Sequence, residues 1–81
     1  MDPAEIKRLI MAGMPEAEVM VRGDDGVHFE AVVISPVFAG KALLQRHRHV
    51  YATLGAKIGG EIHALALHTF TTEEWLKQQP R

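Results

Sequence analysis

Cysteine is absent from the 81-residue chain, which excludes disulfides, a thiolate metal site and a cysteine nucleophile. Long hydrophobic runs are also missing, because no apolar stretch approaches the roughly 20 residues that a membrane-spanning helix needs. The acidic start Met1-Asp2-Pro3-Ala4-Glu5 lacks the basic and apolar regions of a signal peptide. These absences lead us to expect a cytoplasmic location.

Motifs for catalysis are lacking as well. No serine lies near a histidine and an acid in a nucleophile motif. No glycine-rich loop could cradle a phosphate, since Gly23 and Gly26 flank two aspartates that would repel an anion. Asp24 and Asp25 lack the other oxygen ligands of a calcium or magnesium loop, so we interpret them as turn residues. We therefore expect the protein not to be an enzyme.

The composition is that of one folded domain covering residues 1–81. Hydrophobic residues make up 47% of the chain, which is ordinary for a globular domain and too high for a disordered one. The formal net charge is −1, but residues 41–60 contain no Asp or Glu. The basic residues of this segment are Lys41, Arg46, Arg48 and Lys57. Such a segment can steer an anionic partner, although the solvated face of a helix is the commoner explanation.

Hydrophobic periodicity predicts an α+β fold with elements in the order α-β-β-α-β-α. The predicted elements span residues 3–13, 17–22, 27–34, 41–58, 62–70 and 72–78. The turn Gly23-Asp24-Asp25-Gly26 joins the first two strands in an antiparallel hairpin. A helix separates the second and third strands, and a right-handed crossover would set those strands parallel. The result is a three-stranded mixed sheet covered by helices.

Burial can be predicted for the second half of the chain. The apolar run at residues 62–70 is typical of a strand covered on both faces, and we expect His68 to pack with it. The helix before that strand places a row of side chains at helical spacing toward the core. This row consists of Leu43, His47, Val50 and Leu54. A half-buried structural role follows for His47, whereas Arg46 and Arg48 are expected to be solvated. Thr71 and Glu74 form a capping box for the last helix.

Histidine is over-represented in this sequence, with five residues in 81. Imidazole is a good ligand for iron, zinc and copper, and it titrates near neutral pH. His63 is the first ligand candidate, because it stands at the start of the third strand, and the alternative is an edge histidine bound to a backbone carbonyl. His28 is the second candidate, on the strand face opposite Phe29, and its alternative is an ordinary exposed strand histidine.

Two blocks of sequence resemble a known family. The run Ile62-His63-Ala64-Leu65-Ala66-Leu67-His68-Thr69-Phe70-Thr71, followed by Glu74-Trp75, is similar to the C-terminal signature of the BolA family. The run Phe38-Ala39-Gly40-Lys41-Ala42-Leu43-Leu44-Gln45-Arg46-His47-Arg48-His49-Val50-Tyr51 is similar to its second signature. The resemblance implies a variant of the type II KH fold. It also implies a monothiol glutaredoxin partner and a [2Fe–2S] cluster bridging the two proteins, in iron–sulfur cluster trafficking or a response to iron and redox stress.

The resemblance also assigns ligands. It implies that His63 is the family's histidine ligand at the C-terminal strand. The family takes its second ligand, cysteine or histidine, from the loop between the first two strands, where this chain has Asp24-Asp25. His28 is the nearest candidate. The glutaredoxin would contribute its active-site cysteine and a glutathione thiolate, so no cluster is expected on the isolated chain. The expected partner or nucleic-acid surface consists of Arg46, Arg48, His49 and Lys57.

A DNA-binding transcriptional regulator is the alternative function, since the fold resembles KH modules and the family has been linked to transcription. KH domains grip RNA through a G-x-x-G loop, and this sequence has none. That absence argues against RNA and leaves contact with DNA through the basic helix open. A small interaction domain without metal is the third interpretation.

Overall fold

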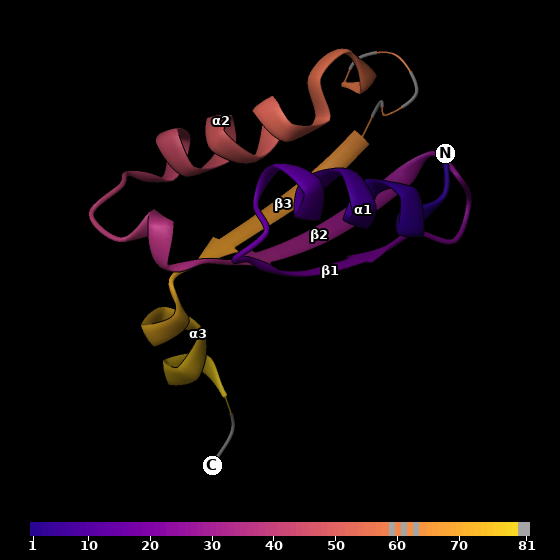
Figure 1. The fold of residues 1–81 in the computed structure, drawn as a ribbon. Coiled ribbons are helices and arrows are strands. Elements are labelled where there is room, and N and C mark those ends of the chain that lie inside the picture. The colour runs from indigo at the N-terminus through magenta and orange to yellow at the C-terminus, as the bar shows by residue number, and fades with distance from the viewer. Residues whose placement is uncertain (59, 61, 63, 80–81) are drawn as a thin grey trace.

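A three-stranded sheet separates two helices on one side from a short third helix on the other. The computed structural model describes residues 1–58, 60, 62 and 64–79. Its elements are α1 (Pro3–Gly13), β1 (Glu18–Arg22), β2 (His28–Ile34), α2 (Leu43–Leu54), β3 (Ala64–Phe70) and α3 (Thr72–Gln78), with 3-10 turns at Pro36–Phe38 and Gly55–Lys57. The two longer helices, α1 and α2, cover one face of the sheet, and α3 extends beyond the opposite face (Figure 1). No helix in the described parts of the chain is long and apolar enough to span a bilayer.

The strand order β1-β2-β3 confirms the predicted mixed sheet. β1 and β2 pair antiparallel across the short hairpin, with Met20 opposite Val32. β2 and β3 pair parallel, from His28 opposite Ala64 to Ile34 opposite Phe70. α2 lies between these two strands in the sequence and supplies the crossover that parallel neighbours require.

The core lies between α1, α2 and the face of the sheet that they cover. Ile6 and Ile10 of α1 follow helical spacing and are fully buried, and β2 buries every second residue from Phe29. Other buried hydrophobic side chains include Met14, Val19, Phe38, Val50, Leu54, Ile62 and Leu67. Gly13 allows the two helices to approach closely, because a Cβ atom at this position would lie 2.6 Å from Cγ2 of Thr53.

α2 is shorter than its periodicity predicted. The predicted span was residues 41–58, whereas the helix begins at Leu43 and ends at Leu54. Gly55 ends it by adopting a φ of +55°, a backbone conformation that glycine reaches without steric cost. Val50 and Leu54 are buried as predicted. Leu43 is 63% exposed, so its predicted burial is wrong, since the first turn of the helix extends past the buried stripe.

The prediction that the third strand is covered on both faces is also wrong. In β3, Leu67 faces the core and is buried, whereas Ala66 and His68 are exposed. α1 and α2 lie on the same side of the sheet, and α3 reaches the other side only near Trp75, whose ring centroid is 5.3 Å from that of Phe70. His68 therefore lies on the open face of the sheet, the face turned away from α1 and α2.

The predicted starts of the first and last helices are confirmed. The side chain of Asp2 accepts a hydrogen bond of 2.9 Å from the backbone N–H of Ala4. At α3, the hydroxyl of Thr71 accepts the N–H of Glu74 at 3.1 Å, and the Glu74 carboxylate accepts the N–H of Thr71 at 2.8 Å. This reciprocal pair satisfies backbone donors that a helix start leaves without partners.

Candidate metal-ligand site and partner surface

His28 and Asp25 form a hydrogen-bonded unit at the hairpin. Nδ1 of His28 lies 2.7 Å from Oδ2 of Asp25. Oδ1 of the same carboxylate accepts the backbone N–H groups of Val27 and His28 at 2.9 and 2.8 Å. The His28 ring, and after it these two backbone donors, hold the pKa of the Asp25 carboxyl well below its usual range. Asp25 is therefore ionised at neutral pH, and it shapes the turn while orienting the imidazole.

Among the described residues, nothing occupies the second ring nitrogen of His28. The side chain is 75% exposed. Asp25 occupies Nδ1, while Nε2 makes no hydrogen bond with any residue that the structure describes. A histidine that binds metal commonly donates its other ring N–H to a carboxylate, which fixes the tautomer and raises the basicity of the ligating nitrogen. His28 has this arrangement and therefore fits the role of an imidazole ligand.

His63, the other predicted ligand, lies outside the described residues. Its neighbour in the sequence, Ala64, is the first residue of β3 and pairs in register with His28, the first residue of β2. Because the two strands are parallel, both begin at the same end of the sheet. The register therefore brings the residue that follows His63 directly beside His28.

A hollow of about 360 Å³ adjoins His28 at this end of the sheet. Its lining residues are Arg22, Gly23, Asp24, Asp25, His28, Phe29 and Glu30. Within residues 1–58, 60, 62 and 64–79, no three His, Asp or Glu side chains come together in a group that could hold a metal ion. A metal bound at His28 consequently needs ligands beyond the described side chains.

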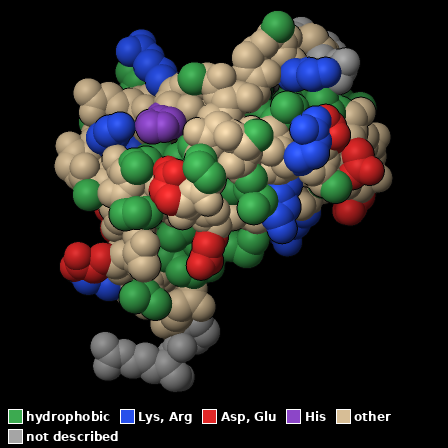
Figure 2. Space-filling view, viewed as in Figure 1, with side chains coloured by type: hydrophobic (Ala, Val, Ile, Leu, Met, Phe, Trp, Pro, Cys, Tyr) green, Lys and Arg blue, Asp and Glu red, His purple; other side chains and the backbone are tan. Residues whose placement is uncertain are grey.

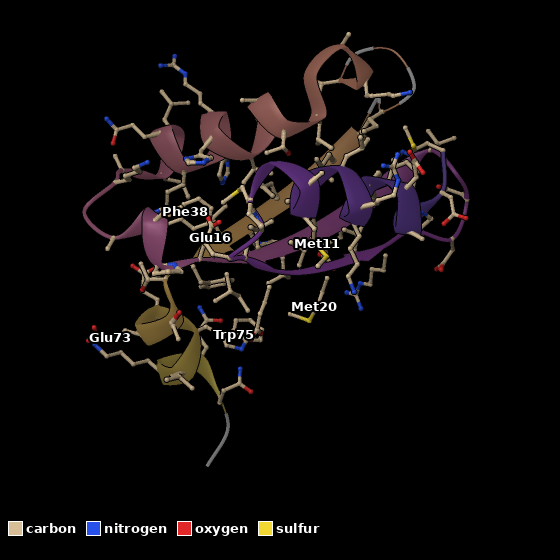
Figure 3. The ribbon with its side chains drawn as sticks, viewed as in Figure 1. Met11, Glu16, Met20, Phe38, Glu73 and Trp75 are labelled. Atoms are coloured by element: carbon tan, nitrogen blue, oxygen red, sulfur yellow. The ribbon has the colours of Figure 1, made fainter. Side chains whose placement is uncertain are left out.

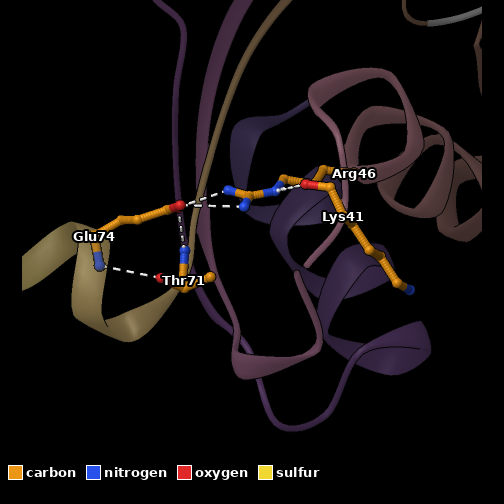
Figure 4. A network of polar contacts seen from close by, with 4 residues as sticks. All are labelled: Lys41, Arg46, Thr71 and Glu74. Atoms are coloured by element: carbon orange, nitrogen blue, oxygen red, sulfur yellow. Dashed lines mark hydrogen bonds and ion pairs between the residues drawn. The ribbon is translucent and has the colours of Figure 1, made fainter. Parts of the chain in front are cut away.

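Arg46 is not solvated, contrary to the prediction. Its side chain is 13% exposed. Its Nη1 and Nη2 atoms donate to Oε1 and Oε2 of Glu74 at 2.6 and 3.1 Å, and its Nε atom donates to the backbone oxygen of Lys41 at 2.8 Å (Figure 4). Arg46 thus joins the start of α2 to the start of α3 and is already occupied by an anion of its own chain.

The other predicted surface residues differ in exposure. Arg48 is exposed on α2 as predicted, and Lys57 is half-buried in the 3-10 turn that follows this helix. His49 is half-buried, with its ring edge-on to Phe38 at a centroid distance of 6.1 Å. Nδ1 of His49 lies 3.4 Å from Nζ of Lys41. Of these side chains, Arg48 is the most open to a partner.

Two further histidines occupy structural positions. His47 is half-buried as predicted, and its ring lies 6.2 Å from that of Tyr51 in an edge-on arrangement. Its buried Nε2 has no hydrogen-bond partner among the described residues. His68 does not pack in the core as predicted, and its Nε2 lies 3.3 Å from Oε2 of Glu30. Arg22 donates to the other oxygen of Glu30 at 2.8 Å, which completes a polar row on the open face.

Sequence reasoning missed two partners of the predicted site residues. Asp25 was interpreted as a turn residue, which is correct for its backbone contacts, but its bond to the His28 ring was not predicted. The available signal is an aspartate three residues before a histidine within one tight turn. Glu74 was assigned to the helix cap alone, and no local signal pairs it with Arg46, which is distant in the sequence.

Comparisons with known proteins agree with the resemblance. Residues 11–74 match the family model described as BolA-like protein. The chain is 48% identical over 48 residues to the DNA-binding transcriptional regulator BolA of Escherichia coli (strain K12), covering 59% of this chain and 46% of the relative. It is 36% identical over 78 residues to an uncharacterized protein in the rpoN-murA intergenic region of Acinetobacter guillouiae, covering 95% and 93% of the two chains.

Some relatives differ from this chain in length, and a solved relative shares its fold. The matches to three bacterial BolA regulators span about half the length of those relatives, from 46% to 54%. The structure of a bolA protein homologue from Coxiella burnetii superposes with a TM-score of 0.84 at 44% sequence identity, covering 94% of this chain and 97% of the other. The family model matches most of this chain, and the chain shares its fold with the Coxiella burnetii homologue. The chain therefore belongs to the BolA family.

Proposed function

We propose that this protein is a non-enzymatic adaptor that pairs with a monothiol glutaredoxin and shares a bridging [2Fe–2S] cluster with it, in iron–sulfur cluster trafficking or the response to iron and redox stress. The observation that carries the proposal is the register of His28 with Ala64, the residue next to His63. The imidazoles of His28 and His63 would serve one iron. The glutaredoxin cysteine and a glutathione thiolate would serve the other.

The residues present fit a shared cluster better than a resident one. The chain has no thiolate, and the described residues contain no complete metal-binding group. When bound, the cluster supplies one-electron redox chemistry, and replacement of thiolate by neutral imidazole on one iron raises its reduction potential. A ligating imidazole must be deprotonated, so retention of the cluster should weaken in acid.

The chain's own residues have distinct tasks in this proposal. His63 and His28 act as ligands. Asp25 acts as a positioning residue, since its carboxylate holds Nδ1 of His28 and leaves Nε2 toward the partner. Arg48 and Lys57 are the proposed partner-facing residues of the basic segment, whereas Arg46 is retained for its structural contact with Glu74.

Reconstitution with a monothiol glutaredoxin and glutathione tests the proposal. Visible circular dichroism should show a cluster signal for the wild-type complex, and His63→Ala and His28→Ala should reduce or abolish it. His68→Ala is the matched control, because His68 is an exposed histidine of the same sheet that lies away from this end. Wild-type spectra for both ligand variants, or a stable cluster on the lone chain, would contradict the proposal.

A DNA-binding role is the second candidate, and the name of the Escherichia coli relative favours it. Arg46 is committed to Glu74, so fewer basic side chains are available to phosphates than the sequence suggested. A gel-shift titration at increasing salt separates the two functions. Duplex binding that falls steeply with salt and weakens in Arg48→Ala would favour the regulator, because each lost phosphate contact reduces the salt dependence.

A further inference from the structure

We propose that β1 is the interface of a symmetric dimer, in which the β1 strands of two copies pair antiparallel and join their sheets. β1 lies at the edge of the sheet and pairs with β2 on one side only within the described residues. The backbone N–H and C=O groups along such an edge can accept another strand. The question is which strand fits it.

The sequence of β1, Glu18-Val19-Met20-Val21-Arg22, is complementary to itself in the antiparallel direction. When two copies pair about a two-fold axis through Met20, Glu18 of each copy lies opposite Arg22 of the other. Opposite charges placed directly across an antiparallel pair are stabilising, and like charges there are destabilising. The dimer contains two such pairs, one at each end of the paired strands.

Symmetry restricts the possible registers. A two-fold axis perpendicular to the sheet keeps the open faces of both copies on the same side of the joined sheet. A shift of one strand by one residue relative to the other would place side chains of the open face opposite side chains of the core face. The remaining alternatives shift one strand by two residues relative to the other. A pairing centred on Val19 or Val21 would leave one end of each β1 strand unpaired, whereas the pairing centred on Met20 uses the whole strand and joins both charged ends.

Exposure along β1 agrees with this pairing. Met20 is an exposed large hydrophobic residue at 46% on the open face. Arg22 contacts Glu30 through Nε and Nη2, but its side chain is 83% exposed, unlike that of Arg46, so it can also meet a carboxylate of the second copy. Glu18 is exposed and forms no ion pair with the described residues. Figure 3 shows Met20 and Trp75 on the side of the sheet away from α1, and both line a groove of about 310 Å³. Dimerisation would cover Met20 with Met20 of the second copy.

The surroundings of β1 favour a second copy over an unspecified strand. Figure 2 shows hydrophobic side chains interspersed with charged ones on the face of the molecule that includes α1 and β1. The opposite edge strand, β3, has the sequence Ala64-Leu65-Ala66-Leu67-His68-Thr69-Phe70 and carries no Asp, Glu, Lys or Arg. Nothing in β3 would select one register or one direction, whereas the charges at the two ends of β1 select both.

The interface is small, so the expected association is weak and reversible. A paired strand of this length buries less than a standard interface, and we expect a dissociation constant between roughly 10 µM and 1 mM. Sedimentation equilibrium across that concentration range measures it directly. A chain that remains monomeric throughout would overturn the proposal and leave this edge to a strand of another protein.

Charge reversal tests the register. Glu18→Arg and Arg22→Glu should each weaken self-association by roughly tenfold, because both symmetry-related pairs become repulsive. Mixing the two variants should restore association, since every cross-strand pair in the mixed dimer is again of opposite charge. Failure of the mixture to associate more tightly than either variant alone would overturn the assigned register. Circular dichroism melting curves establish that each variant is folded, which matters because Arg22 also binds Glu30.

Cross-linking provides a second test that does not depend on charge. The chain has no cysteine, so Met20→Cys introduces a single thiol at the position that the two-fold axis places opposite itself. Mild oxidation should give a covalent dimer of Met20→Cys. Met11→Cys is the matched control, because Met11 is an exposed methionine of similar accessibility on α1. Equal cross-linking of both variants, or none in Met20→Cys, would contradict the proposal.

Discussion

Arg46 binds both carboxylate oxygens of Glu74, and this two-point contact joins α2 to α3 across a long interval of sequence. The Arg46 guanidinium, and after it the backbone N–H of Thr71, lower the pKa of Glu74 from 4.5 to about 2. A carboxyl whose pKa is lower in the folded than in the unfolded chain stabilises the fold when ionised. That stabilisation is complete above about pH 4.5 and is lost as the pH falls through about 2.

The difference in the free energy of unfolding between the wild type and Glu74→Gln should therefore depend on pH. We expect the wild type to be the more stable at about pH 6 and the difference to shrink steadily toward about pH 2, because the wild-type carboxyl is then protonated. Urea unfolding at several pH values measures the difference. Glu73→Gln is the control, since Glu73 is exposed and, among the described residues, pairs with Lys77 on the same helix. A pH-independent difference for Glu74→Gln would contradict the assignment.

Thr71→Ala should lower the free energy of unfolding by about 1 kcal/mol, which is typical for the loss of an N-cap hydroxyl. The physical reason is the loss of the hydroxyl that accepts the N–H of Glu74. Chemical denaturation monitored by Trp75 fluorescence is a suitable measurement, because Trp75 lies on α3. The neighbouring substitution Thr72→Ala removes a hydroxyl that makes no hydrogen bond with the described residues, and it should not destabilise the protein.

Phe38 and Leu43 provide a matched test of the corrected core. Phe38 is fully buried, and Phe38→Ala should cost about 3–5 kcal/mol through lost contacts and the cavity left behind. Leu43→Ala should change stability by less than about 0.5 kcal/mol, because Leu43 is largely exposed. Equal destabilisation by the two substitutions would show that the first turn of α2 packs into the core after all.

Asp25→Asn tests the orientation of His28 and depends on the proposed cluster function. The amide can still accept the backbone hydrogen bonds of the turn, but it no longer offers a charged acceptor to Nδ1 of His28. Loss of such a carboxylate typically weakens metal binding about 10–100-fold. Chelator titration of the glutaredoxin complex, followed by visible circular dichroism, measures cluster retention.

Asp24→Asn is the control for that experiment, since Asp24 makes no hydrogen bond with the described residues. If Asp24→Asn and Asp25→Asn lose the cluster equally, the effect comes from the charge of the loop and not from orientation of the imidazole.

Local signals made most of the fold predictable. The four-residue turn after β1 predicted the hairpin. The capping-box spacing of Thr71 and Glu74 predicted the start of α3, where the two residues make the reciprocal contacts. The exposure of one face of β3 could not be predicted, because leucine alternates there with alanine. Alanine is apolar but small, and it is tolerated equally on an open sheet face and in a core. Which interpretation holds depends on where the helices pack.

The candidate site was predictable only in part. His28 could be placed at the start of a strand, and the crossover rule set that strand parallel to the one following His63. The role of Asp25 depends on the backbone path of the turn, and the role of Arg46 depends on the docking of α3. The three-residue spacing of Asp25 and His28 is a local signal of their contact, whereas nothing in the spacing of neighbouring residues encodes the contact of Arg46 with Glu74.

The register of His28 with Ala64 also determines when the site can exist. α1, α2 and the β1-β2 hairpin form from residues that are close in the sequence, whereas the parallel pairing of β2 with β3 must first close the long crossover loop. During synthesis on the ribosome, His28 is therefore made long before the strand that completes its surroundings. Under the proposed function, a nascent chain that ends before the third strand has His28 but not His63, so the proposed ligand pair would be complete only in the finished domain.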